Sequence, residues 1–488
     1  MNIAFDNSYA RELEGFYVPW QGAPVPKPEV VRLNEPLAVE LGLDPDALRT
    51  REGAAILAGS VAPAGGSPLA QAYAGHQFGG FSPQLGDGRA LLVGEVIDRN
   101  GTRRDIHLKG SGRTPFSRGG DGKAVLGPVL REYLVGEAMH ALGIPTTRAL
   151  AAVATGERVY REGPRPGAVL ARVASSHLRV GTFQFFAARG DVEKVARLAD
   201  YAIERHDPDL AGRADRYLTF LQRVAERQAA LVARWMHVGF VHGVMNTDNM
   251  TISGETIDYG PCAFIDAYSP AAVFSSIDHQ GRYAYGNQPA IARWNIARLA
   301  ETLLALIDPE DEDRAVARAT DVVDAFAIHY EARWLDGMRR KIGLSTEEEG
   351  DGELVADLLG VLNTHAVDFT QGFRRLAESA LGQDDAMRAL FGDPAGIDAW
   401  LAAWRNRLQR EPLDPAQRAE AMNRVNPIYI PRNHLVEEAL TAASDGDLAP
   451  FDTLLGVLAD PFRRREGLQA YETPAPPSFG RYTTFCGT

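Results

Sequence analysis

The chain has 488 residues, of which 45% are hydrophobic and 24% are charged. This composition is typical of a folded globular protein, and the length allows two to four domains or one enlarged domain. The 64 acidic and 51 basic residues give a net charge of −13, which argues against nucleic acid or an anionic membrane as the main partner. Only two cysteines are present, so a fold built on disulfide bonds is excluded.

The sequence contains no recognisable targeting signal. The first residues lack the basic and apolar segments of a signal peptide, and no run of about 18 apolar residues occurs. We therefore expect a cytoplasmic protein without a membrane span. No heptad pattern or broad apolar stripe indicates a dimer, so we expect a monomer.

Residues 1–72 have little regular pattern. A proline-rich run over 19–28 precedes a short helix expected around 36–43, and the small-residue stretch 58–68 follows. We interpret this segment as an N-terminal extension with loops.

Residues 73–178 have the signals of a β-rich lobe. Two apolar runs, 90–97 and 106–109, are joined through Asn100-Gly101, which is a strong hairpin signal. A helix is predicted over 128–142 from apolar residues that recur every four positions. Further extended runs are expected at 147–153, 157–161 and 168–174.

The rest of the chain is helical by its hydrophobic periodicity, so the sequence predicts an α+β protein. We expect a large lobe over 179–310 and a helical region over 311–488. The acidic stretch 345–353 interrupts the pattern and is interpreted as a solvated loop. Helices with one apolar face are predicted over 191–204, 214–237 and 288–307.

A cation-rich segment lies between the first apolar run and the predicted helix. It contains five basic residues and a single acidic residue, Asp105, beside glycine turns. This local excess of positive charge indicates a phosphate site in an otherwise acidic protein. A solvated basic loop explains the same charges equally well. No GxxxxGK[ST] motif occurs, so a P-loop NTPase is not supported. The cations are Arg103, Arg104, Lys109, Arg113 and Arg118.

Lys109 ends the second apolar run, which follows the glycine turn formed by Gly86 and Gly88. A glycine turn, a strand, a strand ending in lysine and a helix bearing glutamate form the small lobe of a protein kinase, in that order. The lysine neutralises phosphate charge and the glutamate holds its ammonium group. The helix offers Glu132 and Glu137, and periodicity does not choose between them. Taken alone, Lys109 would be interpreted as a surface lysine on an edge strand.

A second motif favours the functional interpretation. Residues 240–250 include His242 and Asn249, and a hairpin expected over 250–257 leads to Asp258-Tyr259-Gly260. Catalytic loop, hairpin and D-F-G follow one another in this way in the large lobe of a kinase. The side-chain oxygens of Asn249 and Asp258 are of the type that binds a phosphate-bound Mg²⁺. An incidental group of polar loop residues is the weaker explanation.

One position departs from the kinase pattern. The catalytic aspartate of a kinase follows the histidine by two residues, and Val244, which cannot accept a proton, stands there. The nearest carboxylate is that of Asp248. The sequence therefore predicts either an inactive kinase-like protein or one that performs different chemistry on a nucleotide.

Five motifs between residues 73 and 440 are long enough to be specific: YAGHQFGGFSPQLGDGRA, GSGRTPFSRGGDGKAVL, HGVMNTDNM, IDYGPCAF and NPIYIPRNHLVEEAL. Through them the chain resembles the SelO (YdiU) family of kinase-like proteins along essentially its whole length. The resemblance implies a protein-kinase-like bilobal fold that binds ATP in a flipped orientation. It implies transfer of AMP to serine, threonine or tyrosine hydroxyls of proteins, with release of pyrophosphate and with Mg²⁺ or Mn²⁺ as the metal.

The resemblance also implies a role for each matching residue. Asp248 would be the general base, Asn249 and Asp258 would hold the metal, and Lys109 would pair with Glu132. For Arg172 and Arg179, the alternative is an ordinary ion pair at the protein surface. Besides Lys109, Glu132 and Asp258, the nucleotide would be contacted by Gly86, Gly88, Arg89, Asp121, Gly122, Arg172 and Arg179.

The two cysteines also gain a second interpretation. Two reduced thiols are the usual state in the cytoplasm. The resemblance implies a reversible disulfide between Cys262, which lies just after Asp258, and Cys486 in the C-terminal tail. Such a bond would act as a redox switch.

Two other functions stay open on the residues alone. Phosphoryl transfer is supported by the general kinase layout, and a non-catalytic nucleotide-binding pseudokinase scaffold is allowed by Val244. UTP in place of ATP also stays open, because no residue visibly reads the base. The sequence does not identify the protein substrates.

Overall fold

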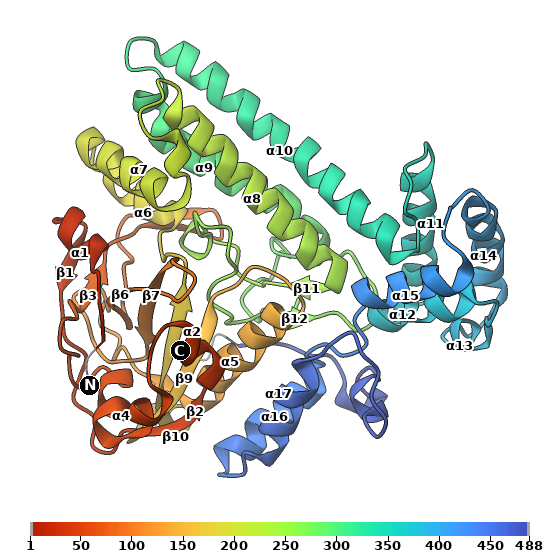
Figure 1. Ribbon diagram of the computed structural model, residues 1–488, viewed down its shortest axis with the longest axis horizontal. Helices are drawn as coiled ribbons and strands as arrows, with labels where there is room; N and C mark the ends of the chain where they lie inside the picture. The colour runs from red at the N-terminus through yellow and green to blue at the C-terminus, as the bar shows by residue number, and fades with distance from the viewer. Residues whose placement is uncertain (1–2, 486–488) are drawn as a thin grey trace.

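An antiparallel β-sheet is built from the first part of the chain. The computed structural model describes residues 3–485, and within them eight strands pair in the order β1-β3-β6-β7-β10-β9-β2, with β8 added to β10. Figure 1 shows the sheet on one side of the molecule and the long helices α8 to α10 crossing beyond it. The strands are β1 (Tyr17–Pro19), β2 (Glu29–Leu33), β3 (Leu69–Gln71), β6 (Ala90–Ile97), β7 (Arg103–Lys109), β8 (Ala124–Val125), β9 (Arg148–Arg161) and β10 (Gly163–Ala174).

The predicted hairpin of residues 90–97 and 106–109 is confirmed. β6 and β7 pair antiparallel, with Ala90 opposite Lys109. β7 begins at Arg103, earlier than predicted, because its first residues are polar and gave no apolar signal.

The predicted runs 147–153 and 157–161 join into one strand, β9. Pro166 of β10 pairs with Arg158 of β9 and Ala168 pairs with Ala154, so the residues of β9 between these two pairs form a bulge. Gly156 adopts a φ of 76° there, a conformation that glycine reaches without steric cost. The bulge explains why the sequence pattern appeared interrupted.

Residues 1–72, expected as an extension, contribute strands to both edges of the sheet. β1 and β3 extend one edge beside β6, and β2 pairs with β9 at the other. The helix expected around 36–43 is confirmed in a shorter form, and the Asn34 side chain caps it by accepting from the Leu37 amide. The helices of this segment are α1 (Ser8–Glu12), α2 (Glu35–Glu40), α3 (Pro45–Arg49) and α4 (Arg51–Leu57).

One helix, α5 (Leu126–Ala141), lies against the sheet and confirms the helix predicted over 128–142. Its Leu130 and Leu134 are buried in one cluster with residues of β9 and β10. Two later helices, α16 (Asn433–Ser444) and α17 (Ala449–Leu458), also pack against α5. Contacts with both the sheet and these helices fix the rotation of α5, and hence the direction of its glutamates.

The second part of the chain is largely helical, and the helices predicted over 191–204, 214–237 and 288–307 are confirmed. α8 ends at Gly239, whose φ of 74° gives the usual left-handed cap. The helices are α6 (Val180–Ala187), α7 (Val192–His206), α8 (Arg216–Val238), α9 (Gln288–Ile307), α10 (Glu312–Lys341), α11 (Asp351–Thr364), α12 (Phe369–Ala380), α13 (Asp385–Arg388), α14 (Ala395–Leu408) and α15 (Pro415–Val425), followed by α16 and α17.

The hairpin expected over 250–257 is wrong. Thr251 pairs with Arg179 and Thr256 pairs with Thr146, so each arm finds its partner in a different neighbouring segment. The loop is closed instead by the Thr251 hydroxyl, which donates to the Glu255 carbonyl and accepts from the Glu255 amide. Both ends of the loop are held by neighbouring segments, so the position of Asp258, which follows the loop, is also fixed.

The acidic stretch 345–353 is only partly the solvated loop that was expected. Asp351 begins α11, is buried, and accepts hydrogen bonds from Arg339 and Arg407, each at 2.8 Å. The charge run therefore includes a buried ion-pair centre between α10, α11 and α14, because two arginines compensate the carboxylate.

The architecture is a mixed α+β one, with an antiparallel sheet region followed by a largely helical part. None of the helices in the described part of the chain combines the length and the apolar character that a membrane span requires.

Candidate active site

A cleft of about 460 Å³ lies where the sheet meets the first helical segments. Its lining combines the glycine turn before β6, the end of β7, the loop before β8 and the loops around Asn249 and Asp258. Glu132 stands behind this lining. The other residues predicted for nucleotide, metal and base all line the cleft: Gly86, Gly88, Arg89, Lys109, Asp121, Gly122, Arg172, Arg179, Asp248, Asn249 and Asp258.

Asp258 is the electrostatic centre of the cleft. Its Oδ1 accepts from Lys109 Nζ at 2.6 Å and from Arg172 Nη1 at 2.7 Å, and its Oδ2 accepts from Arg179 Nη1 at 3.2 Å. Burial alone would raise the pKa of Asp258, but the three cations hold it well below its usual range. Its φ of 61° is unusual for a residue other than glycine. The backbone is therefore strained at Asp258, the residue whose carboxylate contacts three cations.

The structure pairs Lys109 with Glu132. Glu132 Oε2 accepts from Lys109 Nζ at 2.7 Å, and its Oε1 accepts from Arg172 at 3.0 Å. Glu137 instead accepts from Arg148 and from Asn34. The choice that periodicity left open is resolved by the rotation of α5, which turns Glu132 toward the cleft.

The two arginines are not surface residues. Arg172 and Arg179 are each 2% exposed, so the alternative of ordinary surface pairing is wrong. The Arg179 guanidinium lies 4.4 Å from the ring centroid of Tyr73 and donates to the Asp248 carbonyl at 2.9 Å. Two buried, permanently charged groups thus face the same carboxylate, and an anionic ligand would find their charge already in place.

Asp248 has a different environment from Asp258. Burial raises its pKa to about 6, and the nearby Arg179 only partly offsets this effect. Its Oδ2 accepts a long hydrogen bond, 3.4 Å, from Gln77, and its buried Oδ1 has no hydrogen-bond partner among residues 3–485. A carboxylate that is half protonated near pH 6 is suited to accept a proton near neutral pH. Val244 lines the same cleft without a group for this task.

Asn249 and Asp258 both line the cleft, and their side-chain oxygens are of the type that a hard cation binds. The Asn249 amide nitrogen donates to the Val244 carbonyl at 3.0 Å, so the amide oxygen is the atom that a cation would use. No cluster of three or more histidine, cysteine or acidic side chains suited to a metal occurs in the described part of the chain. Two such oxygens in a cleft lined by cations fit Mg²⁺ or Mn²⁺, which usually complete their shell with phosphate and water.

The glycine turn packs closely on the loop before β8. Gly86 has a φ of 70°, and the Phe116 ring occupies the space that a side chain at Gly86 would need. Gly122 has a φ of 69° and lies against the Gly112 backbone. Asp121 accepts from Arg161 at 2.9 and 3.0 Å. The two loops therefore form one wall of the cleft.

The cation-rich segment does not act as a single patch. Lys109 and Arg118 line the cleft, whereas Arg103 pairs with Asp6 and Arg104 pairs with Asp98. Arg113 is exposed and donates to backbone carbonyls of its own loop. Two of the five residues predicted for a phosphate site therefore line the cleft, and a phosphate role for them stays a prediction. Arg103 and Arg104 lie at the far end of β7, and Arg113 lies in the loop after β7.

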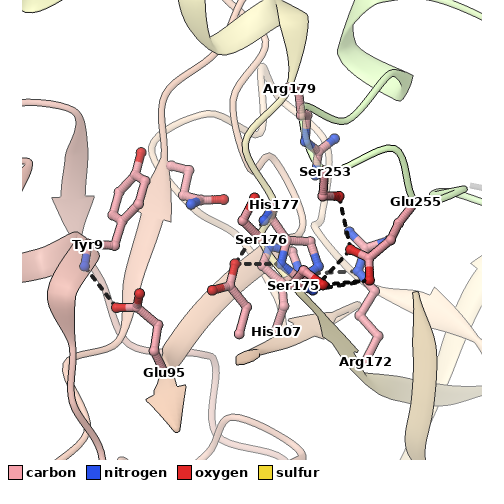
Figure 2. Close-up of polar contacts among 12 residues, drawn as sticks. Tyr9, Glu95, His107, Arg172, Ser175, Ser176, His177, Arg179, Ser253 and Glu255 are labelled. Atoms are coloured by element: carbon pink, nitrogen blue, oxygen red, sulfur yellow. Dashed lines mark hydrogen bonds and ion pairs between the residues drawn. The ribbon is translucent and has the colours of Figure 1, made fainter. Parts of the chain in front are cut away.

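A buried polar network behind the cleft was missed by the sequence prediction. His107 and His177 (Figure 2) stack with ring centroids 4.1 Å apart. Asp87 contacts His107, and Asp105 contacts His177. Glu255 accepts from the amide and hydroxyl of Ser175 at 2.9 Å each, which fastens the segment after β10 to the loop before Asp258. One signal was available: alternate residues of a strand share a face, so His107 lies on the face of Lys109.

Three cations converge on Asp258, whose pKa is lowered, beside Asp248, whose pKa is raised. This arrangement fits an enzyme that transfers a group from a polyanionic donor. The comparisons with known proteins specify the class further. The family model described as protein adenylyltransferase SelO matches residues 1–459.

Two relatives named protein nucleotidyltransferase YdiU align along nearly their whole length. The protein of Cereibacter sphaeroides strain KD131 is 64% identical over 490 residues, which cover 100% of both chains. The protein of Rhizobium leguminosarum bv. trifolii is 60% identical over 487 residues, covering 99% of this chain and 97% of its own. The chain belongs to the SelO (YdiU) family of protein adenylyltransferases and is a protein nucleotidyltransferase.

Proposed function

We propose that this protein transfers AMP from ATP to serine, threonine or tyrosine hydroxyls of other proteins and releases pyrophosphate. The observation that supports this most is the position of Asp248. A buried carboxylate whose pKa is about 6 stands next to the cation cluster, while the position of a kinase base holds Val244. The test is the intact mass of an acceptor protein after incubation with ATP and Mg²⁺: a gain of one AMP supports the proposal, and a gain of one phosphate contradicts it.

The proposed organisation is that of a protein kinase. Residues 73–178 would form the small lobe, 179–310 the large lobe with the catalytic and metal loops, and 311–488 a helical region that ends in the tail. The cleft between sheet and helices and the Lys109–Glu132 pair support this division. The segment 1–72 would then extend the small lobe at both edges of its sheet.

The phosphates of ATP would take over contacts that Asp258 makes here. Lys109, Arg172 and Arg179 all donate to its two oxygens, and these donors match the charge of a pyrophosphate leaving group. Asn249 and Asp258 would hold Mg²⁺ or Mn²⁺, which when bound would neutralise phosphate charge. The glycine turn and the Asp121–Gly122 loop would form the wall against the rest of the nucleotide.

The proposed reaction is one in-line displacement at the α-phosphorus. The oxygen of the acceptor hydroxyl forms a bond to the α-phosphorus as the bond to the pyrophosphate oxygen breaks, and Asp248 takes the hydroxyl proton. The buried cations would face the developing negative charge, so little reorganisation would be needed during the step. The products are an AMP-modified side chain and pyrophosphate.

The pH dependence of kcat/KM reports on Asp248. The proton acceptor works only as a carboxylate, and burial raises the pKa of Asp248 to about 6. We therefore expect kcat/KM to rise about tenfold per pH unit below pH 6 and to level off above it. Initial rates of AMP transfer between pH 4.5 and 8 test this expectation. A flat profile over that range would contradict the assignment of the base.

Glu132 and Glu137 form a matched pair on α5. Glu132→Gln weakens the hold on Lys109 and Arg172, so we expect kcat/KM for ATP to fall by about 10- to 100-fold, or roughly 1.4 to 2.7 kcal/mol. Glu137→Gln weakens the bonds to Arg148 and Asn34 outside the cleft, so its kcat/KM should stay within about twofold. Equal losses in the two variants would show that the helix, rather than the ion pair, is responsible.

A redox switch is the second part of the proposal. Cys486 lies outside the described residues, whereas Cys262 is buried and burial raises its pKa to about 11. Thr484, two residues before Cys486, donates to the carbonyl of Pro261 at 2.8 Å, and this contact supports the pairing of the two cysteines. Mild oxidation should remove two hydrogens from the intact mass in the wild type but not in Cys486→Ser. An unchanged wild-type mass would contradict the pairing.

A further inference from the structure

His107 connects the glycine turn to the cation cluster. It lies on β7, two residues before Lys109, and its side chain is fully buried. Its Nε2 is 3.3 Å from Asp87 Oδ2, and Arg172 Nε donates to its Nδ1 at 3.2 Å. Asp87 is the residue between Gly86 and Gly88. Figure 2 shows His107 beside Arg172 and His177.

The donor and acceptor groups of Arg172 and Asp87 determine which ring nitrogen of His107 carries the proton. A guanidinium has only donors, so Nδ1 of His107 must be the acceptor. The ring proton is therefore on Nε2 and points at the carboxylate of Asp87. Burial lowers the pKa of His107, which agrees with a neutral ring. A protonated ring would place two N–H groups against each other at Arg172.

The rest of the surroundings hold the ring in one orientation. His177 stacks on it with an interplanar angle of 16°, and Asp105 fixes His177 through a contact of 2.9 Å to Nδ1. Asp87 also accepts from the Gln71 amide at 3.0 Å, so the carboxylate is anchored to β3. The imidazole has fixed partners on its face and at both nitrogens.

Arg172 needs a further partner to fix its orientation, because its Nη1 is shared between two carboxylates. Its Nη1 donates to both Glu132, at 3.0 Å, and Asp258, at 2.7 Å. When phosphate displaces Asp258 from this nitrogen, the Nε contact to His107 would still define the plane of the guanidinium. Asp87 also lies 3.9 Å from Arg179, so the carboxylate of the glycine turn contacts Arg179 directly and Arg172 through His107.

We infer that His107 is a positioning residue that aims Arg172 at the pyrophosphate part of the nucleotide, with Asp87 as its anchor. This inference rests on the proposed role of Arg172 as a phosphate ligand. It assigns a function to the Asp87–His107 pair that goes beyond packing. The glycine turn then does more than cover the nucleotide, because through His107 on β7 it sets the direction of a cation on β10.

Two substitutions of His107 distinguish a role in orienting Arg172 from a role in packing alone. The amide oxygen of His107→Asn lies where Nδ1 lies and can still accept from Arg172, whereas the longer His107→Gln reaches toward Asp87 and leaves Arg172 without its acceptor. Arg172→Ala is the reference for loss of the cation itself. The full-length protein is titrated with inorganic pyrophosphate by calorimetry, and kcat and KM for ATP are measured in parallel. Melting temperatures establish that each variant is folded.

We expect His107→Gln to weaken pyrophosphate binding and to lower kcat by about 10-fold or more, in the direction of Arg172→Ala, while His107→Asn stays within about threefold of the wild type. Equal losses in the Asn and Gln variants, with Arg172→Ala impaired, would contradict the positioning role and leave the phosphate role intact. Unchanged pyrophosphate binding in Arg172→Ala would instead overturn the phosphate role, and the inference with it.

Discussion

Asp258→Asn reduces AMP transfer by about 10³-fold or more, because the substitution removes a charge that the proposed metal site requires. Loss of a metal ligand costs several kcal/mol of transition-state stabilisation, and each 1.4 kcal/mol is a factor of about ten. The same change unbalances the cleft, since Lys109, Arg172 and Arg179 lose the carboxylate that they share. We therefore expect the free energy of unfolding to fall as well, by about 3 kcal/mol.

Transfer rates and urea unfolding of the same preparations test both expectations. Asp98→Asn is a suitable control, because Asp98 is also buried and paired with an arginine but lies in the turn between β6 and β7. It should lose stability without losing kcat. Full activity in Asp258→Asn would remove Asp258 from the metal site, and unchanged stability would mean that the cations do not depend on it.

Asp248→Asn has the opposite effect on stability. Without a proton acceptor, kcat should fall by about 10²- to 10⁴-fold. The raised pKa of Asp248 means that the fold disfavours its charged form above pH 6, so a neutral amide relieves a cost that is present at pH 7. That cost fades as the pH falls from about 6 through 3.8, the ordinary pKa of an aspartate, below which the carboxyl is protonated in both states. The variant should therefore melt at a higher temperature than the wild type at pH 8, and the difference should shrink toward pH 5.

Thermal melts at several pH values and single-turnover rates check this expectation. ATP binding should be retained, since Asp248 is not among the donors to phosphate. A melting temperature several degrees below that of the wild type at pH 8 would contradict the raised pKa. Wild-type kcat would contradict the role of the base. The contrast between Asp248 and Asp258 separates two neighbouring carboxylates by the sign of their effect on stability.

The central elements of the fold could be predicted because their signals are local. The Asn-Gly turn fixed the β6–β7 hairpin, and apolar periodicity located α5, α8 and α9. The edge strands β1 and β2 could not be found in this way, since short strands are stabilised by partners far along the chain. The expected hairpin at 250–257 failed for the same reason: its arms pair with Arg179 and Thr146.

The parts of the candidate site that follow from the order of motifs along the chain were predicted. The order of Lys109, Asn249 and Asp258 along the chain indicated a nucleotide site, and the structure brings all three to one cleft. The partner of Lys109 needed the rotation of α5, which depends on packing against later helices. Asp87 and His107 were missed because a buried histidine on a strand has no signature until its neighbours are known.

The most direct test of the account uses two samples of ATP, one labelled on the α-phosphate and one on the γ-phosphate. Each is incubated with the reduced protein, Mg²⁺ and a mixture of acceptor proteins, with Asp258→Asn as the control. We expect protein-bound label from the α-labelled sample only, with loss of that label in the control. Label from the γ-labelled sample only would mean phosphoryl transfer and would contradict the assignment of Asp248 as the base of an AMP transfer.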